Sequence, residues 1–178
     1  DELTSRVFET FWSHIDGRPN VRGGHHRVDM LPTTCHVYFG KVTGALPDGK
    51  RDGETVSEGI SPVQGADRRG PTAALNSAAK FDHIKTGGTL LNQKLTPTLL
   101  DDRQGIDHFV HLVRGYFAKD AHHIQFNVVT RETLLEARAH PEKHRDLIVR
   151  VAGDSDYFVN LTPELQEEII KRTEQEEF

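Results

Sequence analysis

Apolar side chains recur at helical spacing in two long segments of the chain. The first segment covers residues 1–15 and stops at Gly17, and the second covers residues 106–117 after Gly105. A period of three to four residues places these side chains on one face. Both segments are therefore predicted to be amphipathic helices.

Three further helices are predicted from composition and from end signals. Residues 71–81 are rich in alanine, and residues 131–139 also favour a helix. The last helix begins after Thr162, which can cap it, and has Pro163 at its first position. The expected buried stripe of this helix is Leu165, Ile169 and Ile170.

Three segments between these helices have strand patterns. Residues 33–40 are rich in β-branched and aromatic side chains, and residues 147–152 form an apolar run that breaks at Gly153. In residues 123–129, apolar and polar side chains alternate, which is typical of a strand with one apolar face. The polar positions of this strand are Gln125 and Asn127. Most of residues 18–70 is rich in Gly and Pro turns and is predicted to be loop.

The composition excludes several classes of function as first choices. The chain has 178 residues, the size of one domain or of a piece of one, and its net charge is -5. An acidic balance without a basic patch argues against nucleic acid as a partner. No apolar run is long enough for a membrane span, and the acidic start does not resemble a signal peptide, so a cytoplasmic location is expected. Because the chain begins with Asp1 rather than Met, it is expected to be a processed product, a product of recombinant expression or a section of a longer polypeptide.

Histidine and cysteine are the residue types that suggest metal or nucleophile chemistry here. The chain has 11 histidines but no HExxH motif, and adjacent histidines on a strand point to opposite faces, so no metal site is expected. Cys35 is the single cysteine and cannot hold an iron–sulfur cluster or a zinc ion by itself. In the predicted strand 33–40, Cys35 is expected to be a small buried side chain rather than a nucleophile.

The residues of the segment 146–158 do not by themselves define a chemical role. Residues 147–152 are consistent with a buried strand, and Gly153 with the turn that ends it. Glycine at a strand end usually serves the backbone conformation of the turn rather than a chemical function.

Longer blocks of the sequence resemble the glycyl radical enzymes. Residues 148–153 (IVRVAG), followed by the pattern LxPELQxEIIxRTE at residues 161–174, are similar to the carboxy-terminal signature of that family. The other similar blocks are RVDMLPTTCHVYFG (27–40), EGISPVQGADRRGPTA (58–73), HIKTGGTLLNQK (83–94) and DAHHIQFNV (120–128). The upstream blocks look most similar to cobalamin-independent glycerol and propanediol dehydratases, with isethionate sulfite-lyase nearby.

The resemblance implies an α/β fold, the carboxy-terminal part of a ten-stranded α/β barrel with the glycyl radical loop and a terminal helix. Residues 1–130 would supply late barrel strands and helices of the pyruvate formate-lyase type. Residues 131–178 would form the glycyl radical domain. The full enzyme would sit in the cytoplasm of an anaerobic cell, and its assembly as a homo-oligomer is left open.

The resemblance also implies a radical on Gly153, installed by a separate S-adenosylmethionine activase that carries its own iron–sulfur cluster. No cofactor would be bound by the chain itself. The loop that the activase engages would comprise Arg150, Val151, Ala152, Asp154 and Ser155. Asp154 stands where the family pattern has Tyr, and a carboxylate in a buried loop needs partners or has a raised pKa.

The activity implied is elimination of water or a similar leaving group from a small, polar, diol-like substrate. It would proceed through a thiyl radical on a cysteine of the amino-terminal part, because the family's Gly-Cys-Val-Glu loop is missing here and Cys35 lies in a different block. Candidate residues of the pocket wall are Ser61, Pro62, Gln125 and Asn127. For Gln125 and Asn127, ordinary hydrogen bonding in the sheet is the favoured alternative.

Two other functions remain open from the sequence. One is a non-catalytic radical-bearing spare part that docks onto a damaged or split enzyme. The other is an engineered or inactive interaction module. In either case the 178-residue chain is not expected to be active alone.

Overall fold

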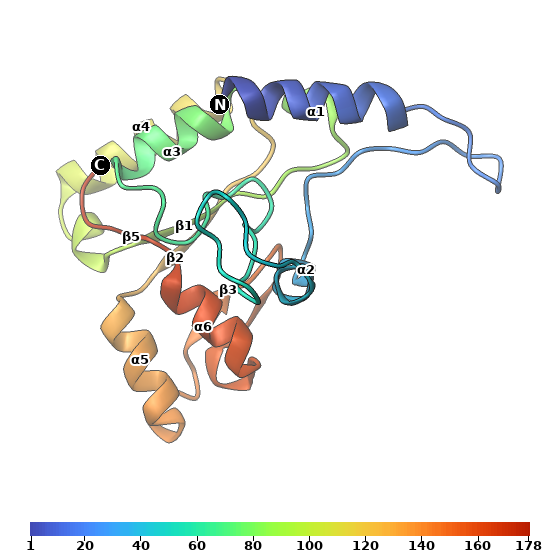
Figure 1. Cartoon of the computed structure of the whole chain (residues 1–178). Helices are drawn as coiled ribbons and strands as arrows, with labels where there is room; N and C mark the ends of the chain where they lie inside the picture. The colour runs from blue at the N-terminus through green and yellow to red at the C-terminus, as the bar shows by residue number, and fades with distance from the viewer.

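The centre of the structure is a short parallel sheet, seen in a computed structural model that describes residues 1–178 (Figure 1). Its strands are β1 (Asn92–Leu95), β2 (Gln125–Val128) and β5 (Glu174–Gln175), in the order β2-β1-β5. Asn92 pairs with Gln125, and Lys94 pairs with Glu174. The sheet therefore joins segments from the middle and the end of the chain.

Parallel neighbours need a crossover, and helix α4 (Arg103–Phe117) provides it between β1 and β2. Helix α3 (Gly70–Ala78) lies beside α4, whereas α5 (Arg131–Ala139) and α6 (Pro163–Lys171) lie together on the other side of the sheet (Figure 1). Helix α1 (Glu2–Ile15) runs across the top of this view, and a long connection leads from it to α2 (Cys35–Val42). Short 3-10 helices cover His83–Lys85, Pro97–Leu100, Pro141–Lys143 and Phe158–Asn160.

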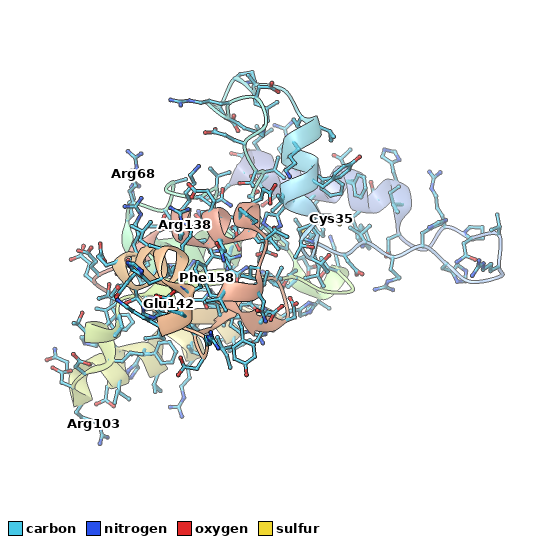
Figure 2. The ribbon with its side chains drawn as sticks, turned by 90° about the horizontal axis from the view of Figure 1, so that it is seen from below. Cys35, Arg68, Arg103, Arg138, Glu142 and Phe158 are labelled. Carbon is cyan, nitrogen blue, oxygen red and sulfur yellow. The ribbon has the colours of Figure 1, made fainter.

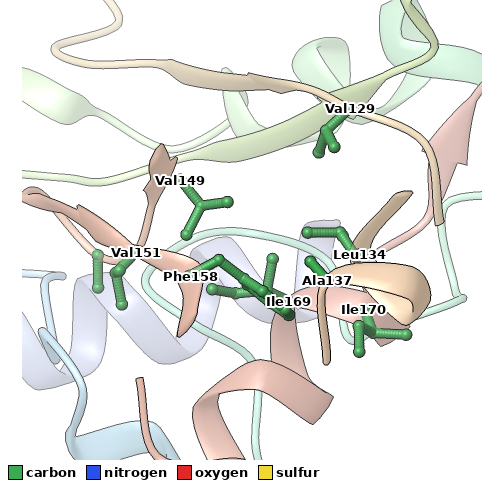
Figure 3. Close-up of a cluster of buried hydrophobic side chains, with 9 residues drawn as sticks. Val129, Leu134, Ala137, Val149, Val151, Phe158, Ile169 and Ile170 are labelled. Atoms are coloured by element: carbon green, nitrogen blue, oxygen red, sulfur yellow. The ribbon is translucent and has the colours of Figure 1, made fainter. Parts of the chain in front are cut away.

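A separate antiparallel hairpin lies against the α5 and α6 side of the sheet. It consists of β3 (Ile148–Arg150) and β4 (Ser155–Tyr157), with Arg150 opposite Ser155. Apolar side chains from the hairpin, α5, α6 and the end of β2 form the largest buried cluster (Figure 3). Its nine members are Val129, Leu134, Ala137, Val149, Val151, Ala152, Phe158, Ile169 and Ile170.

The helices predicted at residues 1–15, 71–81, 106–117, 131–139 and after Thr162 are confirmed, with ends that shift by a few residues. The Thr162 hydroxyl accepts a hydrogen bond from the Leu165 amide at 3.4 Å, as expected for a cap. Ile169 and Ile170 are buried, and Leu165 is half-buried. The strands at 123–129 and 147–152 are also present, although both are shorter than predicted.

The strand predicted at residues 33–40 is wrong, because this segment is helix α2. A turn precedes it: the Cys35 amide donates to the Pro32 carbonyl at 3.0 Å, and Thr33 has a positive φ of 53°. A side chain on Gly40 would lie 2.2 Å from the Glu54 carbonyl oxygen, so glycine lets this helix approach the neighbouring loop. β-branched and aromatic content favours strands only weakly, and tertiary contacts override it here.

Cys35 is exposed, which contradicts the predicted buried position. Figure 2 shows it on α2, at the edge of the molecule. None of the helices is long and apolar enough to cross a lipid bilayer.

Candidate functional site

The turn between β3 and β4 carries Gly153 at a backbone angle that favours glycine. Its φ is +97°. The Val151 amide donates to the Asp154 carbonyl at 3.0 Å, and the Ala152 amide donates to the Asp154 carboxylate at 3.3 Å. Gly153, Asp154 and Ser155 are all exposed in this chain, so the expectation of a buried loop is not met here. An added Cβ on Gly153 would meet the Leu90 side chain at 3.3 Å.

Side chains from both neighbouring parallel strands fix the backbone that leads into this turn. Asn127 of β2 pairs with Arg150 in both directions: its Nδ2 donates to the Arg150 carbonyl at 2.9 Å, and its Oδ1 accepts from the Arg150 amide at 2.8 Å. The Val151 carbonyl accepts from Asn92 Nδ2 at 3.3 Å and from Gln125 Nε2 at 3.4 Å. The polar face of β2 is therefore buried against the hairpin and supplies hydrogen bonds to it.

Arg172 follows α6 and holds the same two carbonyls from the opposite direction. Its Nη2 donates to the Val151 carbonyl at 2.9 Å, and its Nη1 donates to the Arg150 carbonyl at 3.2 Å. The remaining side of the guanidinium faces the Glu168 carboxylate, with Nη2 to Oε2 at 2.7 Å and Nε to Oε1 at 3.0 Å. Both side chains are almost fully buried, and the guanidinium donates to the Glu168 carboxylate and to two backbone carbonyls.

Glu168 remains ionised in this environment. Burial opposes ionisation, but the Arg172 guanidinium and hydrogen bonds from neighbouring side chains outweigh burial and lower the pKa of Glu168 to about 2. One of these bonds comes from Gln64 Nε2, at 2.9 Å from Glu168 Oε1.

Glu58 is a second buried carboxylate, but its pKa is raised rather than lowered. Its Oε2 accepts from the Ser61 hydroxyl at 3.2 Å and from Asn92 Nδ2. Its Oε1 has no partner. Burial raises the pKa of Glu58 to about 7, although Arg172 and Asn92 act against the rise. Because the Asn92 amide also reaches the Val151 carbonyl, Glu58 is linked to the turn through one side chain.

The candidate pocket residues separate into two groups. Ser61 and Pro62 line a cavity of about 750 Å³ between α1 and α3, and they also line a small polar cavity of about 20 Å³ beside Glu58. Gln125 and Asn127 line neither cavity, since their amides are hydrogen-bonded to β3 and its turn. No three His, Cys, Asp or Glu side chains are grouped closely enough to hold a metal ion.

Sequence reasoning missed the residues that anchor the turn. Glu58, Asn92, Glu168 and Arg172 were not identified as site residues, and β1 was not predicted as a strand. A signal for one pair was present, because Arg172 directly follows the last helix and lies four positions after Glu168, a spacing that places two side chains on one face. Nothing in the run Asn92–Leu95 distinguishes a buried strand from a polar loop.

Comparison with known proteins decides which family has this arrangement. A model of the family described as glycine radical matches residues 56–159, more than half of the chain and including the whole turn. The chain belongs to the glycyl radical family. The resemblance inferred from the sequence blocks is thereby confirmed.

Relatives in this family are dehydratases and lyases. The chain is 55% identical to trans-4-hydroxy-L-proline dehydratase of Clostridioides difficile over 98% of its own length and 22% of that protein. It is 43% identical to isethionate sulfite-lyase of Desulfovibrio desulfuricans over 85% of the chain and 19% of the relative.

Solved structures of the family share the fold. The hydroxyproline dehydratase of Clostridioides difficile superposes with a TM-score of 0.94, covering 99% of this chain and 22% of that one. The B12-independent glycerol dehydratase of Clostridium butyricum, 41% identical, also gives 0.94 with the same coverage. The chain thus spans about a fifth of the length of these glycyl radical enzymes, corresponds to their carboxy-terminal part and carries the radical domain.

Removing the buried guanidinium should strongly destabilise the chain. Arg172→Met leaves the Glu168 charge buried without its partner, which typically costs about 3–5 kcal/mol of unfolding free energy. The control Arg138→Met breaks an exposed ion pair with Glu167 and should cost less than about 1 kcal/mol. Urea unfolding of both variants measures the difference, and similar losses would contradict the role assigned to Arg172.

The raised pKa of Glu58 predicts a particular pH dependence of stability. Because the folded chain binds this proton more tightly than the unfolded chain, the contribution of Glu58 to stability should fall as pH rises from about 4.5 to about 7 and then stay level. Glu58→Gln has no carboxyl group at this position and should not show this loss of stability with rising pH. The unfolding free energy of the variant, relative to wild type, should therefore be higher at pH 8 than at pH 5, by up to about 3 kcal/mol. Urea unfolding at the two pH values tests this, and an unchanged difference would refute the raised pKa.

Proposed function

We propose that this chain is the radical-bearing portion of a glycyl radical dehydratase and that Gly153 stores the radical. The observation that carries the proposal is the position of Gly153. It lies within the matched family segment, on an exposed turn with φ +97°, immediately after backbone whose carbonyls are held by buried side chains.

The chemistry of a backbone radical supports glycine at this position. Removing one hydrogen atom from a glycine Cα leaves an unpaired electron that the adjacent amide nitrogen and carbonyl share. The group becomes planar, which a side chain would hinder. The backbone up to Val151 is held by hydrogen bonds from buried side chains, whereas Gly153, Asp154 and Ser155 are exposed within these 178 residues, so this part of the enzyme does not block a second protein from reaching them.

That second protein would be a separate S-adenosylmethionine enzyme with its own iron–sulfur cluster, which accepts the hydrogen atom from Gly153. Its contact segment would be Arg150, Val151, Ala152, Asp154 and Ser155. The exposed Asp154 carboxylate accepts the Ala152 amide, so it is compatible with the turn in this chain.

The remaining chemistry requires the part of the enzyme outside these 178 residues. A cysteine there would pass a hydrogen atom to the Gly153 radical and become a thiyl radical. The thiyl would remove a hydrogen atom from the substrate carbon next to the hydroxyl-bearing carbon. The hydroxyl group would leave as water by taking up a proton that a neighbouring O–H or N–H of the substrate gives up, and the product radical would take the hydrogen atom back from the thiol. The net change is loss of one water molecule, and the radical is regenerated.

The substrate would be a small hydroxylated molecule. Since the chain is 55% identical to a trans-4-hydroxy-L-proline dehydratase, that compound is the first candidate, and glycerol, 1,2-propanediol and isethionate are the alternatives. Residues 1–130 would contribute late barrel elements, with Ser61 and Pro62 at the pocket wall, and residues 131–178 the radical domain. The oxygen sensitivity of such radicals favours the cytoplasm of an anaerobic cell, where the full enzyme is free to assemble as a homo-oligomer.

Substitution of Gly153 should abolish the radical. After anaerobic activation, the complete enzyme should give a doublet in electron paramagnetic resonance, arising from the one remaining α-hydrogen. Gly153→Ala should give no doublet and should lower stability by about 1–2 kcal/mol because of the positive φ. Gly115→Ala, at a glycine with open space around its Cα, is the matched control and should keep the signal. A doublet that persists in Gly153→Ala would disprove the assignment.

Activity should require more than this chain. The complete activated enzyme should eliminate water from trans-4-hydroxy-L-proline, glycerol or 1,2-propanediol, or sulfite from isethionate, as measured by product chromatography. The 178-residue chain alone, given the same activase, should give no product. Turnover by the chain alone would overturn the requirement for an external cysteine and would make Cys35 the candidate for the thiyl radical.

A further inference from the structure

Arg150 contacts the carbonyl group of Gly153 itself. Its Nη2 donates to the Gly153 carbonyl oxygen at 3.3 Å. Its Nη1 donates to the Ser155 hydroxyl at 2.9 Å, and its Nε donates to Gln125 Oε1 at 3.2 Å. One planar guanidinium therefore bonds to Gly153 in the turn and to Ser155 after it, and it connects both to Gln125 of β2.

The backbone of Arg150 is fixed on both sides, which limits where its side chain can reach. Asn127 accepts from the Arg150 amide and donates to the Arg150 carbonyl, and Arg172 Nη1 also donates to that carbonyl. The cross-strand pairing of Arg150 with Ser155 places the two side chains next to each other on one face of the hairpin. Lysine could not reproduce this set of contacts, because a single ammonium lacks the planar fork of donors.

The chemical consequence follows from where the unpaired electron resides. In a glycyl radical, the amide nitrogen gives electron density and the carbonyl withdraws it, so part of the spin lies on the carbonyl oxygen. A cationic donor at that oxygen strengthens the withdrawal, and hydrogen bonds from charged donors are about twice as strong as neutral ones. The Arg150 contact would therefore shift spin from Cα toward the oxygen and stabilise the radical.

We propose that Arg150 holds the turn in place and tunes the Gly153 radical through a hydrogen bond to the carbonyl oxygen of Gly153. This inference rests on the proposed storage of the radical at Gly153. It assigns to Arg150 a contact with the radical group itself, in addition to its place in the segment that an activase would engage.

The direct test is electron–nuclear double resonance on the activated complete enzyme. The amide proton of Gly153 is exchangeable and couples to the radical in any case, so the label is placed on arginine. When all arginines carry 15N, a 15N coupling from the Arg150 guanidinium should appear. This measurement needs no variant, and absence of an arginine 15N coupling in a sample that shows the doublet would overturn the inference.

Variants separate electronic tuning from general stability. Arg150→Met and Arg150→Lys should lose the arginine 15N coupling and show a larger α-hydrogen splitting in any radical that forms. Arg145→Met is the matched control, because Arg145 is exposed on the connection before β3 and has no side-chain hydrogen bond, and it should leave the spectrum unchanged. An unchanged spectrum in both Arg150 variants would overturn the inference but leave the Gly153 assignment intact. Absence of any doublet in wild type would overturn the proposed function and this inference with it.

Discussion

The structure around the turn depends on one buried ion pair, Arg172 with Glu168. The guanidinium has a carboxylate on one side and two backbone carbonyls on the other, so it joins α6 to the end of β3 without leaving any of the partners uncompensated. A buried pair of this kind is costly unless its remaining hydrogen-bonding capacity is used. Here the carbonyls of Arg150 and Val151 use it, and the position of the Gly153 turn is the result.

Polar side chains, rather than apolar packing, determine which side of the hairpin faces the sheet. Amide groups on β1 and β2 bind the same carbonyls, while the apolar cluster on the far side of the hairpin supplies the burial. The backbone is therefore held by side-chain hydrogen bonds through Val151 and, within these 178 residues, is exposed from Gly153 onward. This division suits a site whose reacting atom must be held near its own enzyme and still be reached by another.

Sequence reasoning predicted the parts of the fold that follow local rules. The amphipathic spacing and the Thr162 cap located the helices, and the alternation at residues 123–129 located β2 with its polar face. It failed where non-local contacts decide the structure. Residues 33–40 form a helix because the turn before it and the close approach at Gly40 outweigh a weak strand preference. β1 is polar in sequence yet buried, since its side chains find partners only after distant segments assemble. Gly153 was assigned a role through the resemblance of residues 148–153 to a family signature, whereas no such signature pointed to Asn92 or Glu58.

The most direct measurement of the central claim is the position of backbone cleavage when the activated complete enzyme is exposed to air. A radical on a backbone carbon reacts with oxygen at that carbon, and the chain breaks there. Mass spectrometry should find a carboxy-terminal fragment that begins at or next to Gly153, in an amount that matches the radical lost. A chain that stays intact after losing its radical, or a cut at another residue, would contradict the assignment of the radical to this turn.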